Sequence, residues 1–341
     1  MFKDIKQVMK DSVLYGIGNV AVKLVGFILI PLYTDAEYFS TADYGLMGLL
    51  EVTSQILIAV MGLSLYSGLI RWYWDAEYRD KQKTIFFTTL LFTILTSLCI
   101  GSVLWLNVGE LSALLVQQEG YSLGGELPYI LQLLILTSML GAVVEVPQNL
   151  LRLQRKPIYY SLTNIVRLFA TLVLTIYFTI SLHRGVAGVY EAQLVGIVIQ
   201  LLMVLPLVIK NSSCRVDRKC TIQLLAYSYP LVFPAIVGSL LTVFDRYIIN
   251  HFQGLDDVGF YSLGYKVGNT LKVFIVTSVQ LALTPLLMKK MNDPDNKRFY
   301  SKVLTYFSFG LMFCALGLNL FSREGIVWVT TNPDYIEALY V

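Results

Sequence analysis

Long apolar segments separated by short polar ones dominate this sequence. A membrane-spanning helix needs about 20 consecutive apolar residues to cross a hydrocarbon core of about 30 Å. Nine segments meet that requirement, so the pattern predicts an all-α polytopic membrane protein with nine transmembrane helices. The expected spans are residues 12–33, 43–69, 84–107, 129–151, 158–182, 186–209, 222–250, 258–287 and 303–322.

The composition narrows the class of protein. Of the 341 residues, 56% are hydrophobic and only 14% are charged, whereas soluble domains carry about 25% charged residues. So few charges cannot coat the surface of a soluble protein of this length, which excludes a soluble enzyme, a nucleic-acid-binding protein and a disordered chain. The four cysteines and two histidines show no metal-binding spacing and no disulfide framework. We therefore expect no metal site and no cofactor.

Lysines and arginines divide unevenly between the two sets of loops. The N-terminal segment and every second loop after it carry 19 of the 26, whereas the opposite loops hold only Arg184 and Arg323. Cytoplasmic loops of membrane proteins are enriched in Lys and Arg. The asymmetry therefore predicts a cytoplasmic N-terminus.

A short stretch at the start of the second expected span resembles one at the start of the eighth. Residues 42–49 (ADYGLMGL) and 256–263 (DDVGFYSL) share Asp, Gly and Leu at an offset of 214 residues. The same offset places the third expected span on the ninth, which predicts a parallel repeat of six helices about an axis along the membrane normal. Shared helical periodicity is the alternative explanation of the match.

The repeat predicts two domains. Residues 1–210 form a six-helix bundle, and residues 211–341 form a second, incomplete bundle that ends after its third helix. The equivalents of helices four to six would fall beyond Val341. The chain is therefore either a fragment or a naturally reduced form.

Nine charged residues lie inside the expected spans. A charge at the centre of a membrane helix costs at least about 2.5–3.5 kcal/mol, so such residues usually face a water-filled interior. The bases outnumber the acids, and a net-basic cavity attracts anions such as phosphate through charge-assisted hydrogen bonds. The bases are Lys23, Arg167, Arg246, Lys266 and Lys272, and the acids are Glu51, Glu145, Glu191 and Asp245.

Several of these charges lie on polar helix faces. Asn19 and Lys23 share one face, and Lys23 lies about 16 Å into its span at 1.5 Å per residue. We expect a hydrated groove that binds substrate, in which the carboxylate of Glu51 could equally bind a cation or a proton. For Asp245 and Arg246 a functional and a structural role both stay open. The alternative is hydrogen bonding between helices and contact with lipid headgroups, which we favour for Glu145 and Glu191 near span ends. The expected groove residues are Lys23, Asn19, Arg167, Asn164, Arg246, Lys266 and Asn269.

Two prolines lie one helical turn apart in the seventh expected span. Pro230 and Pro234 each remove a backbone donor, which favours a bend in a membrane helix. We expect a hinge at this position.

Short motifs along the whole chain resemble those of a known family. The family is that of the polysaccharide biosynthesis membrane proteins, the flippases of O-antigen and capsule repeat units. Its members belong with the multidrug and oligosaccharidyl-lipid exporters, which are built from two six-helix bundles around a central cavity. The motifs are Asn19 and Lys23 with PLYT at 31–34 and ADYG at 42–45, DRY at 245–247, VGFYS at 258–262 with Lys266, and YIEA at 335–338.

This resemblance implies transport in the cell inner membrane and no enzymatic activity. The two bundles would rock to open the cavity alternately to each side. Lys23 and Arg167, with Arg246 and Lys266, would hold the pyrophosphate and sugars of a polyprenyl-linked oligosaccharide while its tail stays among the membrane lipids. Glu51 or Asp245 would couple the return to a gradient of H⁺ or Na⁺.

Two alternatives remain open. A cation-coupled drug or metabolite antiporter of the same superfamily would use acids as its main intramembrane charges, whereas here bases outnumber acids by five to four. A membrane glycosyltransferase or acyltransferase would need clustered acids or histidines at one membrane face. The loop 108–128 carries three glutamates but no histidine and no DxD pattern.

Overall fold

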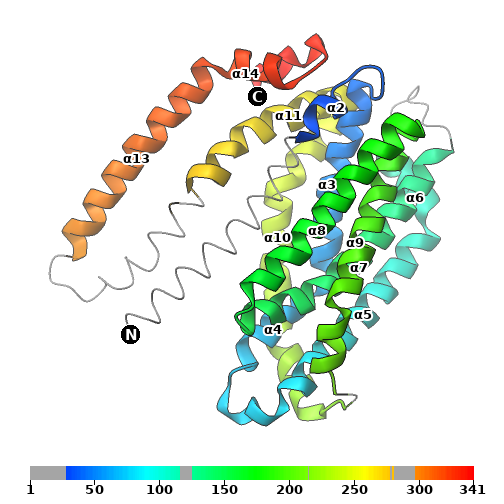
Figure 1. Ribbon diagram of the computed structural model, residues 1–341, viewed down its shortest axis with the longest axis vertical. Helices are drawn as coiled ribbons and strands as arrows, with labels where there is room; N and C mark the ends of the chain where they lie inside the picture. The colour runs from blue at the N-terminus through cyan, green and yellow to red at the C-terminus, as the bar shows by residue number, and fades with distance from the viewer. Residues whose placement is uncertain (1–27, 116–124, 214, 277–278, 280–295) are drawn as a thin grey trace.

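The computed structural model describes residues 28–115, 125–213, 215–276, 279 and 296–341, and within these ranges the chain is helical with no strand (Figure 1). Turns of 3-10 or π-helix occur at Ala76–Lys81, Tyr177–Ser181, Lys272–Val276 and Pro333–Tyr340. The α-helices are α2 (Ile30–Tyr33), α3 (Thr41–Gly62), α4 (Leu65–Trp72), α5 (Gln82–Leu106), α6 (Val108–Leu115), α7 (Glu126–Leu153), α8 (Pro157–Ile176), α9 (Gly185–Asn211), α10 (Arg218–Phe252), α11 (Leu255–Leu271), α13 (Asn296–Leu320) and α14 (Ser322–Val329).

Seven helical segments of the described chain are long and apolar enough to cross a membrane. Each corresponds to one of the nine expected spans, so the chain is a multi-pass membrane protein. The expected span 12–33 lies outside the described residues except at its end, and 258–287 begins as α11 and then leaves them. The seven segments are Thr41–Gly62, Tyr78–Leu106, Glu126–Leu153, Pro157–Ser181, Gly185–Asn211, Arg218–Leu241 and Lys297–Leu320.

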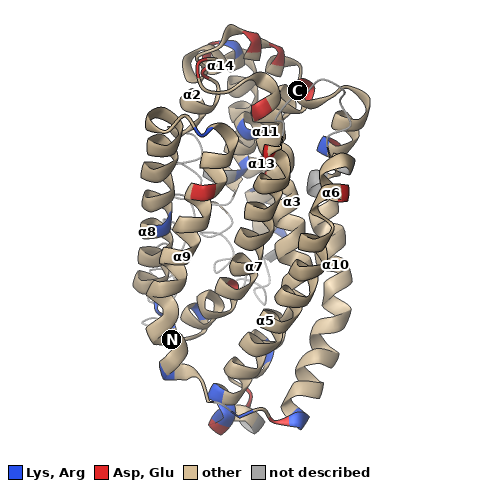
Figure 2. Ribbon diagram, turned by 90° about the vertical axis from the view of Figure 1, so that its right-hand side faces the viewer, with Lys and Arg blue, Asp and Glu red and all other residues tan. Residues whose placement is uncertain are grey.

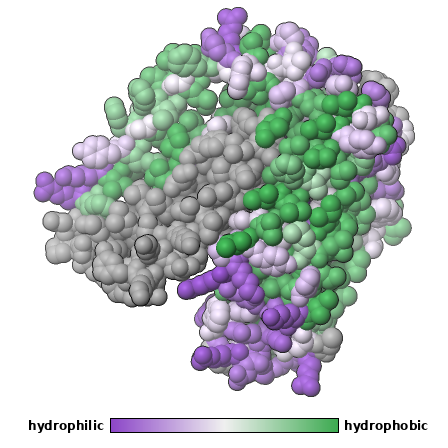
Figure 3. All heavy atoms as spheres, viewed as in Figure 1, coloured by the Kyte–Doolittle hydropathy of each residue, from purple (hydrophilic) through white to green (hydrophobic). Residues whose placement is uncertain are grey.

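The ends and the flanks of the bundle differ in polarity. Apolar side chains cover much of the flank and hydrophilic ones gather at the two ends (Figure 3). Lys and Arg residues cluster at the end where α4 leads into α5 and α9 leads into α10 (Figure 2). An apolar flank between two polar ends is the surface that a bilayer requires.

Helix α3 begins at a capping box and ends at a break. The Ser40 hydroxyl accepts a hydrogen bond from the Asp43 amide at 3.1 Å, and the Asp43 carboxylate accepts one from the Ser40 amide at 2.9 Å. Leu63 and Ser64 then adopt left-handed backbone angles, with φ of 43° and 51°. The expected span 43–69 is therefore two helices, α3 and α4, rather than one.

Side chains replace part of the hydrogen bonding that the break interrupts. The Thr96 hydroxyl donates to the Met61 carbonyl at 2.8 Å, and the Ser64 hydroxyl donates to the Leu231 carbonyl of α10 at 3.4 Å. These bonds occupy carbonyls at the end of α3 and in α10, where water is scarce. Apolar residues continue across the break, so the hydropathy pattern gave no sign of it.

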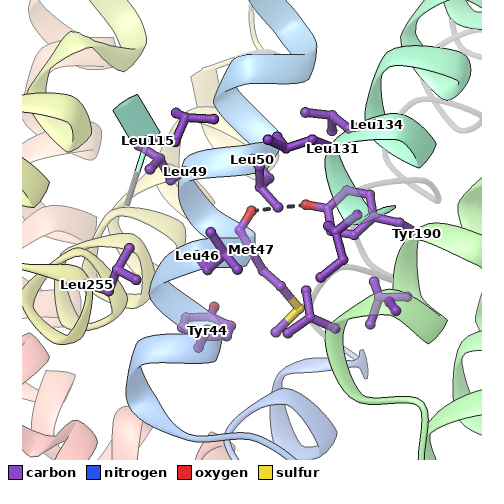
Figure 4. Close-up of a cluster of buried hydrophobic side chains, with 14 of the residues drawn as sticks. Tyr44, Leu46, Met47, Leu49, Leu50, Leu115, Leu131, Leu134, Tyr190 and Leu255 are labelled. Carbon is purple, nitrogen blue, oxygen red and sulfur yellow. Dashed lines mark hydrogen bonds between the residues drawn. The ribbon is translucent and has the colours of Figure 1, made fainter. Parts of the chain in front are cut away.

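Helix α3 lies at the centre of the fold. It packs against α7 and also against α10 and α11, which come much later in the chain. Its buried side chains interlock with those of α7, α9 and α11, and the Tyr190 hydroxyl donates to the Met47 carbonyl at 3.5 Å (Figure 4). This core includes Tyr44, Leu46, Leu49, Leu50, Leu131, Leu134, Tyr190 and Leu255.

The crossing of α3 and α11 depends on two glycines. A Cβ atom on Gly45 would overlap the carbonyl of Leu255, and one on Gly259 would lie 2.6 Å from the carbonyl oxygen of Thr41. The two backbones therefore approach more closely than any larger residue allows. The contact is reciprocal, because Gly259 and Leu255 follow Gly45 and Thr41 at the same offset of 214 residues.

Candidate functional site: two adjoining polar cavities

One polar cavity lies where α3, α9 and α11 meet, and we call it the interface cavity. It has a volume of about 220 Å³. Lys266 of α11 and Glu51 of α3 face each other across it, with the Lys266 Nζ 3.7 Å from the Glu51 carboxylate. The same Nζ lies 5.1 Å from the ring centre of Tyr44, a cation–π contact. The other polar groups of its wall include Ser54, Gln55, Tyr190 and Gln193.

A second cavity lies among α3, α7, α8 and α9, and we call it the bundle cavity. It has a volume of about 260 Å³. Ser54 and Gln193 border both cavities, so the two spaces adjoin. The charged residues of its wall are Glu145, Arg152 and Arg167, and the amides include Gln148, Asn149, Asn164 and Gln200.

The guanidinium of Arg167 is held by neutral groups. It donates to the Gln200 side-chain oxygen at 3.0 Å, and the Gln200 amide donates to the Asn164 side-chain oxygen at 3.0 Å. The Asn164 amide in turn donates to the Tyr160 carbonyl at 2.9 Å. Within the described chain no carboxylate pairs with Arg167, so its charge and most of its five N–H donors are available to a ligand.

Several polar residues of this site were not predicted from the sequence, among them Gln193 and Gln200. Gln193 and Gln200 lie seven residues apart on α9, a spacing that puts both on one helix face and that the sequence already showed. Glu145 was predicted to have a structural role near a span end, but its side chain lines the bundle cavity. Its position is set by α7, which continues past it to Leu153.

Asp245 and Arg246 form a separate polar group between α10 and α11. The Asp245 carboxylate accepts hydrogen bonds from the Tyr261 hydroxyl and, at 2.8 Å, from the Arg246 backbone amide. The Arg246 guanidinium stacks on the Tyr265 ring at 5.0 Å, and the residue is only 6% exposed. Neither residue lines the two cavities described above.

The remaining predicted site residues are not among the described residues that line the two cavities. Asn19 and Lys23 lie outside the described residues. Asn269 is half-buried on α11 and does not line either of the two cavities. Pro230 and Pro234 are exposed, and α10 passes through both of them without interruption. Their role as a hinge stays a prediction.

The charges do not gather in a way that suits a metal. Within the part of the chain that the structure describes, no group of three or more His, Cys, Asp or Glu side chains could hold an ion. The chemistry of the two cavities is that of hydrogen bonding and of charge attraction.

These features define a multi-pass helical membrane protein with a polar interior, and solved structures share its fold. The MATE multidrug transporter DinF-BH matches with a TM-score of 0.70 at 15% identity, over 95% of this chain and 78% of that one. An inward-facing multidrug resistance MATE family transporter of the MOP superfamily matches with a TM-score of 0.68 at 15% identity, over 96% and 75%. A MOP superfamily transporter from Pyrococcus furiosus matches with a TM-score of 0.67 at 15% identity, over 98% and 76%.

The sequence itself gives the family. The model of the polysaccharide biosynthesis protein family matches residues 8–291, and the chain belongs to that family. No curated protein sequence matches the chain significantly. The resemblance noted from short motifs is thereby confirmed, and the fold is that of the MATE and MOP transporters.

Proposed function

We propose that this protein moves a polyprenyl-pyrophosphate-linked oligosaccharide from the cytoplasmic to the outer leaflet of the cell inner membrane by alternating access. In this proposal the N-terminus is cytoplasmic and no covalent chemistry takes place. Family membership supports a role in polysaccharide synthesis. The fold of known transporters supports transport rather than catalysis.

The observation that carries the proposal is the uncompensated charge of Arg167 in the bundle cavity. The cavity wall holds two arginines and one glutamate, so it is net positive. A guanidinium binds phosphate through paired N–H donors, and this attraction is strong where water is scarce. The bundle cavity therefore suits the pyrophosphate of a lipid-linked glycan.

The lipid tail of such a substrate has an apolar surface beside it. On the α8 segment that carries Arg167, the side chains of Leu162, Ile165 and Phe169 are exposed. These face the bilayer in a membrane-embedded bundle. The same helix thus presents a cation inward and an apolar surface outward, as an amphipathic lipid requires.

The two-bundle architecture belongs to the same proposal. We propose nine spans, arranged as a first bundle over residues 1–210 and a second over 211–341 that is related to it by the 214-residue repeat. The reciprocal approach of Gly45 to Leu255 and of Gly259 to Thr41 supports that relation. Rocking of one bundle against the other would open the interface cavity to each side in turn.

A cation-coupled drug or metabolite antiporter is the second candidate. Glu51 favours it, because its side chain is 54% exposed within the polar interior and a carboxylate there attracts a cation. The neighbouring Lys266 opposes it, because the ammonium group already compensates that charge. Within the flippase proposal, Glu51 and Asp245 are the candidate sites for a coupling H⁺ or Na⁺.

Flipping in reconstituted vesicles tests the proposal. The full chain is placed in liposomes with a fluorescent polyprenyl-pyrophosphate oligosaccharide, and the fraction of probe reaching the opposite leaflet is followed by quenching. We expect Arg167→Gln to slow flipping at least tenfold, and Lys23→Gln combined with Arg167→Gln to abolish it. Lys83→Gln, which removes an exposed lysine of α5, is the matched control and should flip at the wild-type rate.

Two results would overturn the proposal. One is flipping that is unaffected by loss of both cations. The other is an absence of flipping in the wild type together with Glu51-dependent efflux of an organic cation, which would establish the antiporter.

A further inference from the structure

The two adjoining cavities differ in charge. In the interface cavity the charged lining residues of the described chain are Lys266 and Glu51, and they pair with each other at 3.7 Å. The charged residues that line the bundle cavity are two cations, Arg152 and Arg167, and one carboxylate, Glu145. A phosphate is therefore attracted to the bundle cavity, whereas the interface cavity suits a neutral, strongly hydrogen-bonding group.

The interface cavity has free hydrogen-bonding groups of both kinds. Neither Gln55 nor Gln193 makes a side-chain hydrogen bond with another described residue, and each amide offers donors and an acceptor. The half-exposed carboxylate of Glu51 adds further acceptors. Sugar hydroxyls donate and accept at once, so amide and carboxylate groups together match them better than lysines or arginines alone.

Three tyrosines line the interface cavity beside the apolar side chains of Met47 and Val189. Tyr33, Tyr44 and Tyr190 all line this cavity, and Tyr190 is fixed by its bond to the Met47 carbonyl. Aromatic rings combine an apolar body with a polar hydroxyl. A sugar ring has the same dual character, with C–H groups on its faces and hydroxyls at its rim.

The size of the cavity limits what it admits. Its 220 Å³ falls below the range of about 300–1,000 Å³ typical of drug-sized ligands. It accommodates one sugar residue rather than a whole oligosaccharide. Lys266 comes from α11 and the other polar groups from α2, α3 and α9, so a sugar bound here touches both halves of the chain.

The two cavities are spaced along α9 so that one substrate could place its phosphate in one cavity and its sugar in the other. Gln200, which holds Arg167, lies seven residues from Gln193, or about 10 Å along the helix. A substrate whose phosphate lies at Arg167 and Gln200 thus brings its attached sugar to Gln193. Ser54 and Gln193 border both spaces, so the two positions lie in neighbouring cavities.

We infer that the interface cavity is a subsite for a sugar residue of the substrate, bound by Gln55, Gln193 and Glu51, while the bundle cavity takes the phosphate. The inference rests on the proposed function and assigns the two chemical parts of the substrate to separate groups of residues. Recognition of the glycan and recognition of the lipid phosphate are then separable by mutation.

Binding of two probes to the purified full chain tests this division. One probe is polyprenyl pyrophosphate without sugars, and the other is the same lipid carrying the oligosaccharide. We expect Gln55→Ala to weaken the glycosylated probe at least fivefold and to leave the bare lipid unchanged. We expect Arg167→Gln to weaken both probes by the same factor. Gln253→Ala, an exposed glutamine at the end of α10, is the matched control and should alter neither.

The possible outcomes distinguish failure of the sugar subsite from failure of the proposed function. If Gln55→Ala leaves both probes unchanged while Arg167→Gln weakens both, the sugar subsite is refuted and the proposed function stands. If Arg167→Gln affects neither probe, the proposed function itself fails. Glu51→Gln, which preserves side-chain size, is the second variant should Gln55→Ala misfold, and it too should weaken only the glycosylated probe.

Discussion

Arg167 and Lys266 are both cations inside the membrane region, but their neighbours give them different capacities. Arg167 donates to a neutral amide, whereas Lys266 faces the Glu51 carboxylate at 3.7 Å. The charge of the lysine is therefore already compensated, and that of the arginine is not. The sequence alone does not distinguish the two residues, since each is a base within an expected apolar span.

The shape of the Arg167 guanidinium is as important as its charge. A lysine at this position keeps the charge but loses the planar fork that holds Gln200 and phosphate together. We expect Arg167→Lys to retain measurable flipping, at a rate between the wild type and Arg167→Gln. The vesicle assay with the fluorescent lipid-linked oligosaccharide measures this, and a wild-type rate would show that charge alone suffices.

At the scale of single residues, the sequence revealed the charged side chains but not the side chains that they contact. Arg167, Asn164, Glu51 and Lys266 were found because polar residues are conspicuous in apolar segments. The pairing of Lys266 with Glu51 was not found, because it joins helices far apart in the chain and depends on the angle at which they cross. Hydrophobic periodicity carries no information about that angle.

At the scale of elements, the start of α10 is fixed by a surface carboxylate. Asp217 caps the helix by accepting from the Lys219 backbone amide at 3.0 Å, and it also accepts from the Lys81 ammonium group. The hydrogen bond from Lys81, and next that from the Lys219 amide, lower the pKa of Asp217. The carboxylate thus stabilises the fold above its usual pKa and loses this effect as the pH falls through its lowered pKa.

The substitution Asp217→Ala tests how much the Asp217 carboxylate contributes to the stability of the fold. At neutral pH we expect a small fall in Tm, of about 1–3 °C, because an exposed cap and ion pair contribute little. The difference between variant and wild type should shrink as the pH is lowered towards 3, since the wild-type carboxylate then becomes protonated. Thermal unfolding in detergent across this pH range measures it, and a difference that grows on acidification would contradict the assignment.

The close crossing of α3 and α11 predicts a larger loss of stability on substitution. A methyl group on Gly45 would overlap the Leu255 carbonyl, which belongs to the backbone and cannot rotate away. We expect Gly45→Ala to destabilise the protein by about 1–3 kcal/mol, the usual range for overpacking. Gly238→Ala on α10, where a Cβ meets nothing within 4 Å, is the control and should not be destabilising. Equal Tm values for the two variants would show that the crossing is looser than described.

At the scale of the whole molecule, the sequence predicts a multi-pass helical membrane protein, and the structure agrees. The structure adds a helix break and two cavities that the sequence did not predict. The seven spanning segments follow from length and hydropathy alone, because a bilayer imposes both. The break at Leu63 and Ser64 did not follow, since it depends on partners in other helices, Thr96 and Leu231. The cavities are likewise properties of packing, which only the three-dimensional arrangement fixes.

Alternating access predicts that a covalent tie between α3 and α11 stops transport. The Thr41 hydroxyl and the Asp256 carboxylate are in contact beside the glycine crossing. In a background with all four cysteines replaced by serine, we expect Thr41→Cys with Asp256→Cys to lose at least nine-tenths of its flipping on oxidation and to recover with reductant. Thr84→Cys with Ser213→Cys, a hydrogen-bonded pair 3.0 Å apart, ties the start of α5 to the residues directly after α9 and leaves α3 and α11 free to separate, so it should be tolerated.

If the oxidised Thr41–Asp256 variant flips substrate at the rate of its reduced form, the two helices do not separate during the cycle. A rocking motion that separates the two halves at this contact would then be excluded.

The contact at Gly45 and Gly259 is reciprocal, as contacts across a symmetric dimer interface are, but both sides belong to one polypeptide. In a homodimer the same patch meets its own copy, so one mutation changes both sides at once. In a single chain the two patches mutate independently. Gly48 faces Ser262, its counterpart at the 214-residue offset, across this contact. One half has the smaller residue and the other the larger, an asymmetry that an assembly of identical subunits cannot acquire.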